Sequence, residues 1–397
     1  MRRVLFVSEA VTLAQVVRLA TLARALDRDR FEVHFAAADF DEMIFAGTAF
    51  TRHRIHSLAP DTVAARVASG RRIYGRRTLG RYVDEERALL RTLRPRLVVG
   101  DLRLSLSVSA ALERIPYASL INAYWSPHVV REDFPLPDHP IVKLLGVRLA
   151  ARYFPKARPS VFRHFARPVN ALRARNGLSP LGSLEDVLTH GDHTLFPDVP
   201  ALIPTRDLPA HQQYLGPVLW SPPVPSPPWW NALDAQRPTI YVTLGSSGRI
   251  ECLPLVVDVA AGLGYQVLVA TAGRAKLGAV RRHVYVADYL PGHLAARRAA
   301  LVVSNGGSTT GYQALAEGRP VLGIAANLDQ HLAMTAIEEA GAGLLLRAGT
   351  LTREALADAL PRVSEPAYTH AASRLRDEFA RWNAPAAFAT FVDEATA

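Results

Sequence analysis

Residues 301–330, LVVSNGGSTTGYQALAEGRPVLGIAANLDQ, are the stretch that decides the fold. The short apolar run Leu301–Val303 is typical of a buried parallel strand. A turn rich in glycine and hydroxyl residues follows at Ser304–Thr310, and the pattern then predicts a helix over Gly311–Glu317. Where a strand passes through a glycine turn into a helix, free N–H groups and the positive end of the helix dipole point to one spot. That spot suits a diphosphate.

The same stretch continues into a second strand, Val321–Ile324, with Asp329 and Gln330 just beyond its end. In open α/β folds this edge of the sheet is where ligands bind. A glycine turn alone is weak evidence, since many helices begin on one for packing reasons.

The full pattern resembles the donor-binding signature of nucleotide-sugar glycosyltransferases of the GT-B fold, the macrolide and plant small-molecule (UDP-glycosyltransferase) family. That signature has a His-Gly-Gly or His-Cys-Gly turn, an acid, Gly-x-Pro and then Asp-Gln. Here Asn305 takes the place of the His, and Asp329 lies 24 residues after it. The resemblance implies an α/β protein with two doubly wound Rossmann-like domains facing a cleft.

Two further segments carry the resemblance. The strand Thr239–Leu244 ends in a Gly-Ser turn, Gly245–Gly248, like the one that opens the family's donor domain. Asp288–Pro291 is similar to the family's segment against the nucleotide base. Carried over position by position, the resemblance implies a diphosphate site at Ser246, Ser247, Asn305, Gly306, Gly307, Ser308, Thr309 and Thr310, nucleoside contacts at Leu290 and Gln313, and donor-sugar contacts at Asp329 and Gln330.

The N-terminal half opens as a β-α-β unit, with strands at Val4–Val7 and Phe31–Ala37 and a helix at Leu13–Leu26. In the family, a His at the start of this helix is the general base. Alignment of the helices places that position at Gln15, and a glutamine cannot accept a proton at neutral pH. Either another group is the base, or the acceptor needs little help, or the chain is inactive.

Asp101 follows the predicted strand Leu97–Gly100, where an open α/β sheet places functional residues. In the family an Asp here orients the catalytic His. In this chain we expect Asp101 either to hold Gln15 or to act itself as the base. The alternative is an N-cap for the helix predicted over Ser105–Leu112.

The acceptor is expected to bind in loops of the N-terminal half. After the predicted strand Tyr117–Ile121, an aromatic loop supplies the acceptor-side candidates Tyr124, Trp125 and His128. His128 is also a substitute base candidate, although a lone loop histidine is more often an ordinary surface residue. Asp39 and Asp41 look like a metal-binding Asp-x-Asp but are better explained as loop or N-cap residues. We therefore predict no catalytic metal and no cofactor other than the nucleotide diphosphate sugar as co-substrate.

Two domains are expected from the length of 397 residues. A proline-rich stretch marks the boundary and favours an extended spacer. The last helix, predicted near Ala371–Ala395, would cross back to the first domain. The predicted division is 1–213 for the acceptor domain, 214–230 for the linker, 231–370 for the donor domain and 371–397 for the returning helix.

The composition, with 49% hydrophobic and 21% charged residues, is that of a globular protein. A single cysteine and an apolar start interrupted at Ser8 and Glu9 favour a cytoplasmic protein. The net charge is +10, and nine basic residues lie between Lys143 and Arg175 among aromatic and aliphatic ones. These charges indicate contact with an anionic membrane surface or an acidic acceptor, or simply solvated helix faces. No nucleic-acid-binding module is present in the sequence, so no nucleic-acid partner is expected.

The sequence thus predicts an inverting, metal-independent glycosyltransferase that moves a hexose from a UDP- or dTDP-sugar to a small, hydrophobic acceptor. Two alternatives stay open. Gln15 suits a catalytically inert nucleotide-binding or partner-activating protein of the same fold, and a nucleotide-sugar epimerase would also fit the fold.

Overall fold

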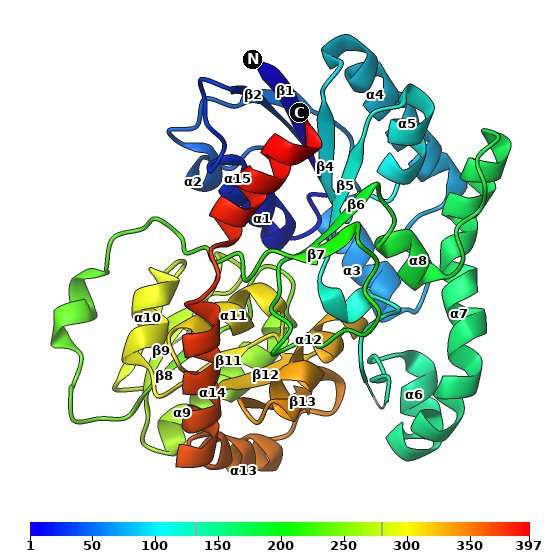
Figure 1. Cartoon of the computed structure of the whole chain (residues 1–397). Helices are drawn as coiled ribbons and strands as arrows, with labels where there is room; N and C mark the ends of the chain where they lie inside the picture. The colour runs from blue at the N-terminus through cyan, green and yellow to red at the C-terminus, as the bar shows by residue number, and fades with distance from the viewer. Residues whose placement is uncertain (132, 279–280) are drawn as a thin grey trace. The chain divides into compact units, whose positions relative to one another are not determined.

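The computed structural model describes residues 1–131, 133–278 and 281–397 (Figure 1). These residues form two compact units. Unit 1 comprises Met1–Asp133, Arg148–Val218 and Trp382–Ala397, and unit 2 comprises Phe134–Val147 and Leu219–Arg381. The chain passes between the units several times, and each unit is considered by itself below.

Unit 1 is built on a seven-stranded sheet in the order β3-β2-β1-β4-β5-β6-β7. All its strand pairs are parallel, and Val4 of β1 faces Val33 of β2 and Leu97 of β4. The central strands are apolar almost throughout because helices cover a parallel sheet on both faces. The strands are β1 (Arg2–Ser8), β2 (Phe31–Ala37), β3 (Thr51–Arg54), β4 (Leu97–Asp101), β5 (Tyr117–Leu120), β6 (His193–Phe196) and β7 (Gln212–Tyr214).

Helices from both ends of the chain cover this sheet. The C-terminal helix α15 (Ala384–Ala395) lies on α1 (Leu13–Ala23), as the red and blue helices of Figure 1 show. Phe388 packs on Phe6 of β1, with ring centroids 5.8 Å apart. The other helices of unit 1 are α2 (Glu42–Phe45), α3 (Pro60–Ala68), α4 (Arg76–Leu93), α5 (Leu106–Glu113), η1 (Ala123–Trp125), α7 (Val147–Arg175, whose first residue groups with unit 2) and α8 (Leu184–Leu188).

Unit 2 repeats this design with a six-stranded parallel sheet in the order β10-β9-β8-β11-β12-β13. In both sheets the first strand of the unit is third in the order, and the order reverses between it and the fourth strand. This is the doubly wound arrangement that the sequence predicts. The strands are β8 (Thr239–Thr243), β9 (Gln266–Ala270), β10 (Val284–Ala287), β11 (Leu301–Ser304), β12 (Val321–Ala325) and β13 (Gly343–Arg347).

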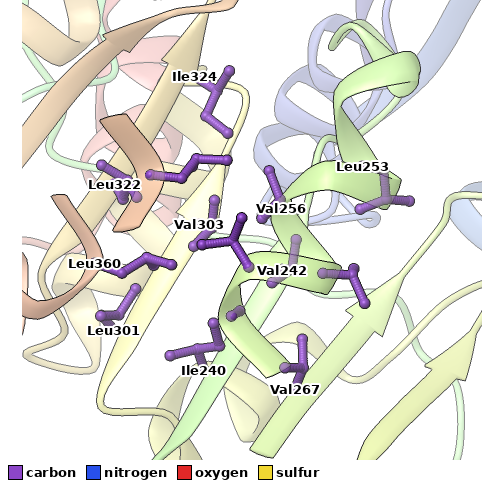
Figure 2. Close-up of a cluster of buried hydrophobic side chains, with 14 of the residues drawn as sticks. Ile240, Val242, Leu253, Val256, Val267, Leu301, Val303, Leu322, Ile324 and Leu360 are labelled. Carbon is purple, nitrogen blue, oxygen red and sulfur yellow. The ribbon is translucent and has the colours of Figure 1, made fainter. Parts of the chain in front are cut away.

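Buried aliphatic side chains hold the helices of unit 2 against its sheet (Figure 2). Val256 of α9 and Leu360 of α13 meet Val242 and Val303 of the central strands. The helices are α6 (Pro140–Leu145), η2 (Pro228–Ala232), η3 (Ile250–Cys252), α9 (Leu253–Gly262), α10 (Gly292–Arg298), α11 (Ser308–Ala316), α12 (Leu328–Glu339), η4 (Ala348–Thr350), α13 (Arg353–Val363) and α14 (Pro366–Phe379).

Several predicted boundaries are wrong. The helix expected from Gly311 begins at Ser308, since the hydroxyl residues form its first turn. The single helix expected over 371–395 is two helices, because Asn383 caps a new helix by accepting a hydrogen bond from Ala386 N at 3.1 Å. Asp101 is the last residue of β4 and does not cap α5.

Phe134–Val147 belongs to unit 2 although the chain on both sides of it belongs to unit 1. Arg347 of β13 donates hydrogen bonds to the carbonyl oxygens of Leu136 and Pro137, each at 2.9 Å. It also forms an ion pair with Asp138 at 2.8 Å. Burial would raise the pKa of Asp138, but His331, Arg347 and the N–H of Gly349 together lower it. The segment is therefore fixed to unit 2 by charge-assisted hydrogen bonds.

The longest helix of the chain, α7, has 29 residues and three internal prolines. Of the helices in the described ranges, none has the length and apolar character needed to cross a bilayer.

Candidate functional site

Each sheet has one topological switch point, where the strand order reverses and ligands of doubly wound proteins bind. In unit 2 this point lies between β8 and β11, and in unit 1 between β1 and β4. The residues predicted to bind the donor lie at or near the switch point of unit 2. The residues predicted for catalysis lie at the switch point of unit 1.

In unit 2, one side chain joins the two loops at the switch point. Asn305, directly after β11, donates its Nδ2–H to Ser247 Oγ at 3.1 Å. Its Oδ1 accepts a hydrogen bond from Gly307 N, also at 3.1 Å. Asn305, at the family's His position, thus joins the Gly-Ser loop, Gly245–Gly248, to the glycine turn, Ser304–Thr310. These two segments together form the donor cradle.

Two glycines of this cradle leave no room for a side chain. Gly306 has φ +78°, and a Cβ there would lie 2.8 Å from Met334 Cγ. A Cβ on Gly248 would lie 2.2 Å from the carbonyl oxygen of Leu244 and 2.8 Å from Asn305 Cβ. Arg274 binds the carbonyl oxygens of Gly245 and Gly248, at 3.0 and 2.9 Å. These two carbonyl oxygens therefore point towards Arg274. The sequence did not indicate a role for this arginine.

Helix α11 begins at this cradle, with Gly307 as its N-cap. Ser308, Thr309 and Thr310 form its first turn, and a helix makes no internal hydrogen bonds with its first N–H groups. Ser246 is exposed on the neighbouring loop. The predicted diphosphate residues thus come from two adjacent loops and one helix start, an arrangement that binds anions.

Asp329 and Gln330 lie just beyond β12, as the sequence predicts, in the first turn of α12. Gln330 Oε1 accepts hydrogen bonds from Ala326 N and Asn327 N, at 2.9 and 3.3 Å. Its Nε2 is buried and has no hydrogen-bond partner among the described residues. Since an unsatisfied buried donor is costly, this amide group suits a ligand oxygen.

The two nucleoside candidates differ in what they offer. Leu290 is buried in the core of unit 2, so it presents its backbone rather than its side chain. Gln313 donates its Nε2–H to the carbonyl oxygen of Trp220 at 2.7 Å. The amide N–H₂ of Gln313 therefore binds the backbone of Trp220, one residue after the point where the chain enters unit 2 at Leu219.

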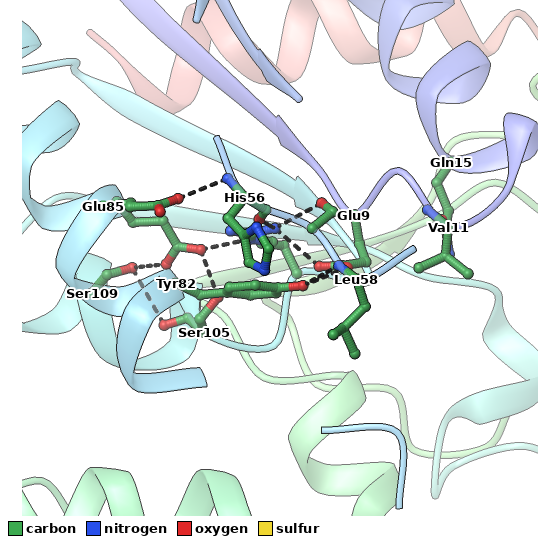
Figure 3. Close-up of polar contacts among 12 residues, drawn as sticks. Glu9, Val11, Gln15, His56, Leu58, Tyr82, Glu85, Ser105 and Ser109 are labelled. Carbon is green, nitrogen blue, oxygen red and sulfur yellow. Dashed lines mark hydrogen bonds and ion pairs between the residues drawn. The ribbon is translucent and has the colours of Figure 1, made fainter. Parts of the chain in front are cut away.

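In unit 1, Gln15 lies in the first turn of α1, and its side chain turns back onto the loop after β1 (Figure 3). Its Oε1 accepts hydrogen bonds from Val11 N and Thr12 N, at 3.2 and 3.1 Å. The oxygen is thus engaged in capping the helix. Only the amide N–H₂, a hydrogen-bond donor, is left for other contacts.

Asp101 is fully buried and paired with Arg18 of α1. Arg18 binds both carboxylate oxygens, with Nε and Nη2 at 2.9 and 2.8 Å. Arg18 Nη1 also donates to Asn122 Oδ1 at 2.6 Å. A carboxylate held by a guanidinium in this forked geometry is a poor proton acceptor. Gln15 makes no hydrogen bond to Asp101.

This network continues into the predicted acceptor loop. Asn122 donates to Asp198 Oδ1 at 2.8 Å, and Asp198 Oδ2 accepts from Ala123 N at 2.6 Å. Tyr124 and Trp125 are buried in unit 1, at 2% and 7% exposure, so they support the loop more than they line an open surface. His128 is partly exposed, and its backbone binds Ser126 Oγ and Arg206 N.

A second buried network lies at the same edge of unit 1, and the sequence did not single it out (Figure 3). Glu9, the first residue after β1, binds Arg103 Nη1 at 3.0 Å and accepts from Tyr82 Oη at 3.1 Å. Arg103 Nε also binds Glu86 at 2.6 Å, and the guanidinium stacks over the Tyr82 ring at 3.7 Å. Burial raises the pKa of Glu9 to about 7, against the opposing effect of Arg103. The sequence held a signal for this network, because Glu9 directly follows the buried strand β1 and Arg103 lies two residues after the buried strand β4.

Asp41 caps α2 by accepting a hydrogen bond from Met43 N at 2.9 Å, which confirms the N-cap interpretation for this residue. Within the described ranges, no group of three or more His, Cys, Asp or Glu residues could hold a metal ion.

Comparisons with known proteins show the family and the fold of this chain. Residues 255–394 match the family described as "Erythromycin biosynthesis protein CIII-like, C-terminal domain". The chain is 50% identical over 382 residues to a PGL/p-HBAD biosynthesis rhamnosyltransferase of Mycobacterium bovis, covering 96% of this chain and 85% of that protein. It is 49% identical over 380 residues to a PGL/p-HBAD biosynthesis glycosyltransferase of Mycobacterium tuberculosis, covering 95% and 89%.

Among solved structures, the spinosyn rhamnosyltransferase SpnG complexed with thymidine diphosphate superposes with a TM-score of 0.69. The identity is 20%, and the match covers 99% of this chain and all of that one. At this identity the likeness establishes the fold, which is GT-B as predicted.

Proposed function

This chain belongs to the family of the PGL/p-HBAD biosynthesis glycosyltransferases, and from that premise we propose that it transfers rhamnose or a related hexose from a nucleoside diphosphate sugar to a small, hydrophobic acceptor. That it is a glycosyltransferase follows from the family. The donor, the acceptor and the mechanism are the proposal. The name of the M. bovis relative favours rhamnose, and the bound nucleotide of SpnG favours a dTDP-sugar over a UDP-sugar.

The observation that carries the proposal is the cradle in unit 2. Asn305 joins the loop after β8 to the turn after β11, directly at the start of α11. A diphosphate bound there would meet backbone N–H groups and hydroxyls that are already in place. Such preorganised donors stabilise the negative charge that grows on the leaving diphosphate, so the proposed reaction needs no metal.

The sugar of the donor is assigned to Asp329 and Gln330. Gln330 has one buried N–H₂ group without a partner, which suits a sugar hydroxyl oxygen. A carboxylate such as that of Asp329 accepts hydrogen bonds from sugar hydroxyls. Direct attack of the acceptor on the anomeric carbon would invert its configuration.

The acceptor side of the proposal has no imidazole at the family position. Gln15 can orient the acceptor through its amide N–H₂ but cannot accept a proton. Asp101 is bound on both oxygens by Arg18, so we assign it the role of a positioning residue. The absence of an imidazole normally lowers the rate by about 10²–10⁴-fold. An acceptor whose hydroxyl ionises easily would reduce this loss.

The test is a transfer assay with dTDP-rhamnose, dTDP-glucose and UDP-glucose against a panel of small hydrophobic alcohols and phenols. We expect release of free nucleoside diphosphate together with a glycosylated product, inverted at the anomeric carbon and formed equally well with EDTA. Consumption of donor with retention of configuration, or loss of activity with EDTA, would refute the proposed mechanism. Conversion of the sugar with the diphosphate still attached would identify an epimerase instead.

A further inference from the structure

Exposed apolar side chains are concentrated in one short part of the chain. Within the described ranges eleven large hydrophobic residues are exposed, and seven of them lie between residues 141 and 161. The seven are Ile141 (56%), Leu144 (85%), Leu145 (43%), Val147 (43%), Leu149 (43%), Tyr153 (55%) and Val161 (36%). The first four belong to unit 2. The last three lie on α7 in unit 1, and exposed apolar side chains gathered on a folded protein indicate an interaction surface.

The same part of the chain is uniformly basic. From residue 139 to residue 184 there are nine lysines and arginines and no aspartate or glutamate. On α7, Arg148, Arg152, Lys156, Arg163 and Arg167 are exposed, and none forms an ion pair with a described residue. Elsewhere many surface arginines are paired, as Arg3 is with Glu32. The charge on α7 is therefore available to a partner.

The spacing places the two kinds of side chain side by side on α7. Leu149 and Tyr153 are four residues apart, so they share one face of the helix. Arg148, Arg152 and Lys156 form the adjacent row at the same spacing. Ala166 and Val169 pack the buried side of the helix against the rest of unit 1, and Phe162 is buried as well.

A hollow at the C-terminal half of the helix adds a basic recess. It has a volume of about 530 Å³ and is lined by Ser160, Arg163, Arg167, Asn170, Ala171 and Gly182. In Figure 1 this part of α7 runs beside α8. The guanidinium groups of Arg163 and Arg167 make this hollow suitable for an anionic group such as a phosphate.

We propose that the outer face of α7 binds the surface of an anionic lipid bilayer. Aliphatic and aromatic side chains next to a row of cations are what an interfacial helix presents to the headgroup region. The arginines attract the anionic lipids, and Leu149 and Tyr153 enter the boundary between headgroups and acyl chains. A nucleic acid would use the charge but not the aliphatic side chains.

The experiment is flotation of the full-length protein with vesicles of phosphatidylcholine alone and with vesicles that also contain phosphatidylglycerol. We expect binding to the anionic vesicles only, weakening as the salt concentration rises. Arg148→Glu with Arg152→Glu, and separately Leu149→Asp with Tyr153→Asp, should each weaken binding at least about tenfold.

Matched controls exist elsewhere on the surface. Arg28→Glu with Arg374→Glu changes the net charge equally, at two exposed arginines without ion pairs among the described residues. Leu263→Asp with Leu219→Asp matches Leu149→Asp with Tyr153→Asp in number and charge, and these two leucines are 43% and 40% exposed. The controls should bind anionic vesicles like the wild type. The proposal fails if the controls and the α7 variants lose binding equally, if neutral vesicles bind as well as anionic ones, or if no vesicle binds.

Discussion

The pairing of Asp101 with Arg18 decides what the acceptor side of this enzyme can do. The aspartate that the resemblance implies at this position is present, but Arg18 binds both of its carboxylate oxygens. Neither Gln15 nor Asp101 is therefore free to take a proton. The sequence predicted the position of Asp101 but not its partner, because a buried ion pair between residues 83 positions apart leaves no local pattern.

We predict that Asp101→Asn lowers the free energy of unfolding by about 3–5 kcal/mol, because it removes the carboxylate charge from a buried ion pair with Arg18. Replacing both partners, Arg18→Met with Asp101→Asn, should recover a large part of that loss. Urea unfolding monitored by circular dichroism measures both. Equal stability of Asp101→Asn and the wild type would contradict the buried pair.

Glu9 provides a second prediction for a single residue. Its pKa is about 7 in the folded chain and 4.5 ordinarily. Between these values the folded chain binds more protons than the unfolded one, so the contribution of Glu9 to stability is complete below pH 4.5 and falls as the pH rises towards 7. The fall amounts to about 3 kcal/mol at most. Glu9→Gln has no such proton to lose.

Urea unfolding at pH 5 and pH 8 should therefore show that Glu9→Gln gains stability relative to the wild type at the higher pH. A relative loss on going from pH 5 to pH 8 would contradict the raised pKa.

At the scale of the elements, the loops after β8 and β11 form the donor cradle only because glycines let them approach. Gly248→Ala should push the Gly-Ser loop away from Leu244 and Asn305, at a cost of about 1–3 kcal/mol, and weaken nucleotide binding. Gly80→Ala on α4 is the control, since a Cβ there meets nothing within 4 Å. Isothermal titration with dTDP and thermal unfolding measure the two effects. Unchanged affinity in Gly248→Ala would show that this loop does not touch the nucleotide.

The segment Phe134–Val147 gives another prediction at this scale. Arg347→Ala removes its hydrogen bonds to Leu136 and Pro137 and its ion pair with Asp138. We expect cleavage within 134–147 by a nonspecific protease to become about tenfold faster or more, since cleavage follows the population of the opened segment. Arg353→Ala, which breaks an exposed pair with Asp258, should leave the rate unchanged. Equal rates in the two variants would contradict this anchoring.

At the scale of the whole molecule, the architecture was predictable because the central parallel strands are short apolar runs at the start of β-α repeats. Val4–Val7 and Leu301–Val303 show this directly. Helix α7 was not predicted, because three prolines interrupt its pattern. The grouping of Phe134–Val147 with unit 2 depends on side chains of β13 that are distant in sequence. The cradle residues were named from the family signature, whereas Arg274 and Arg18 lie outside the segments that carry it and were not predicted to make these contacts.

The central claim is that a nucleoside diphosphate binds where Asn305 joins Ser247 at the start of α11. The most direct measurement is isothermal titration of dTDP and UDP into the wild type, Asn305→Ala, Ser247→Ala and the double variant, with Asn176→Ala in unit 1 as the control. We predict that Asn305→Ala raises the Kd of the better nucleotide about tenfold or more, and that the two substitutions are non-additive because they break one hydrogen bond. The same Kd in the wild type and the double variant would contradict the account.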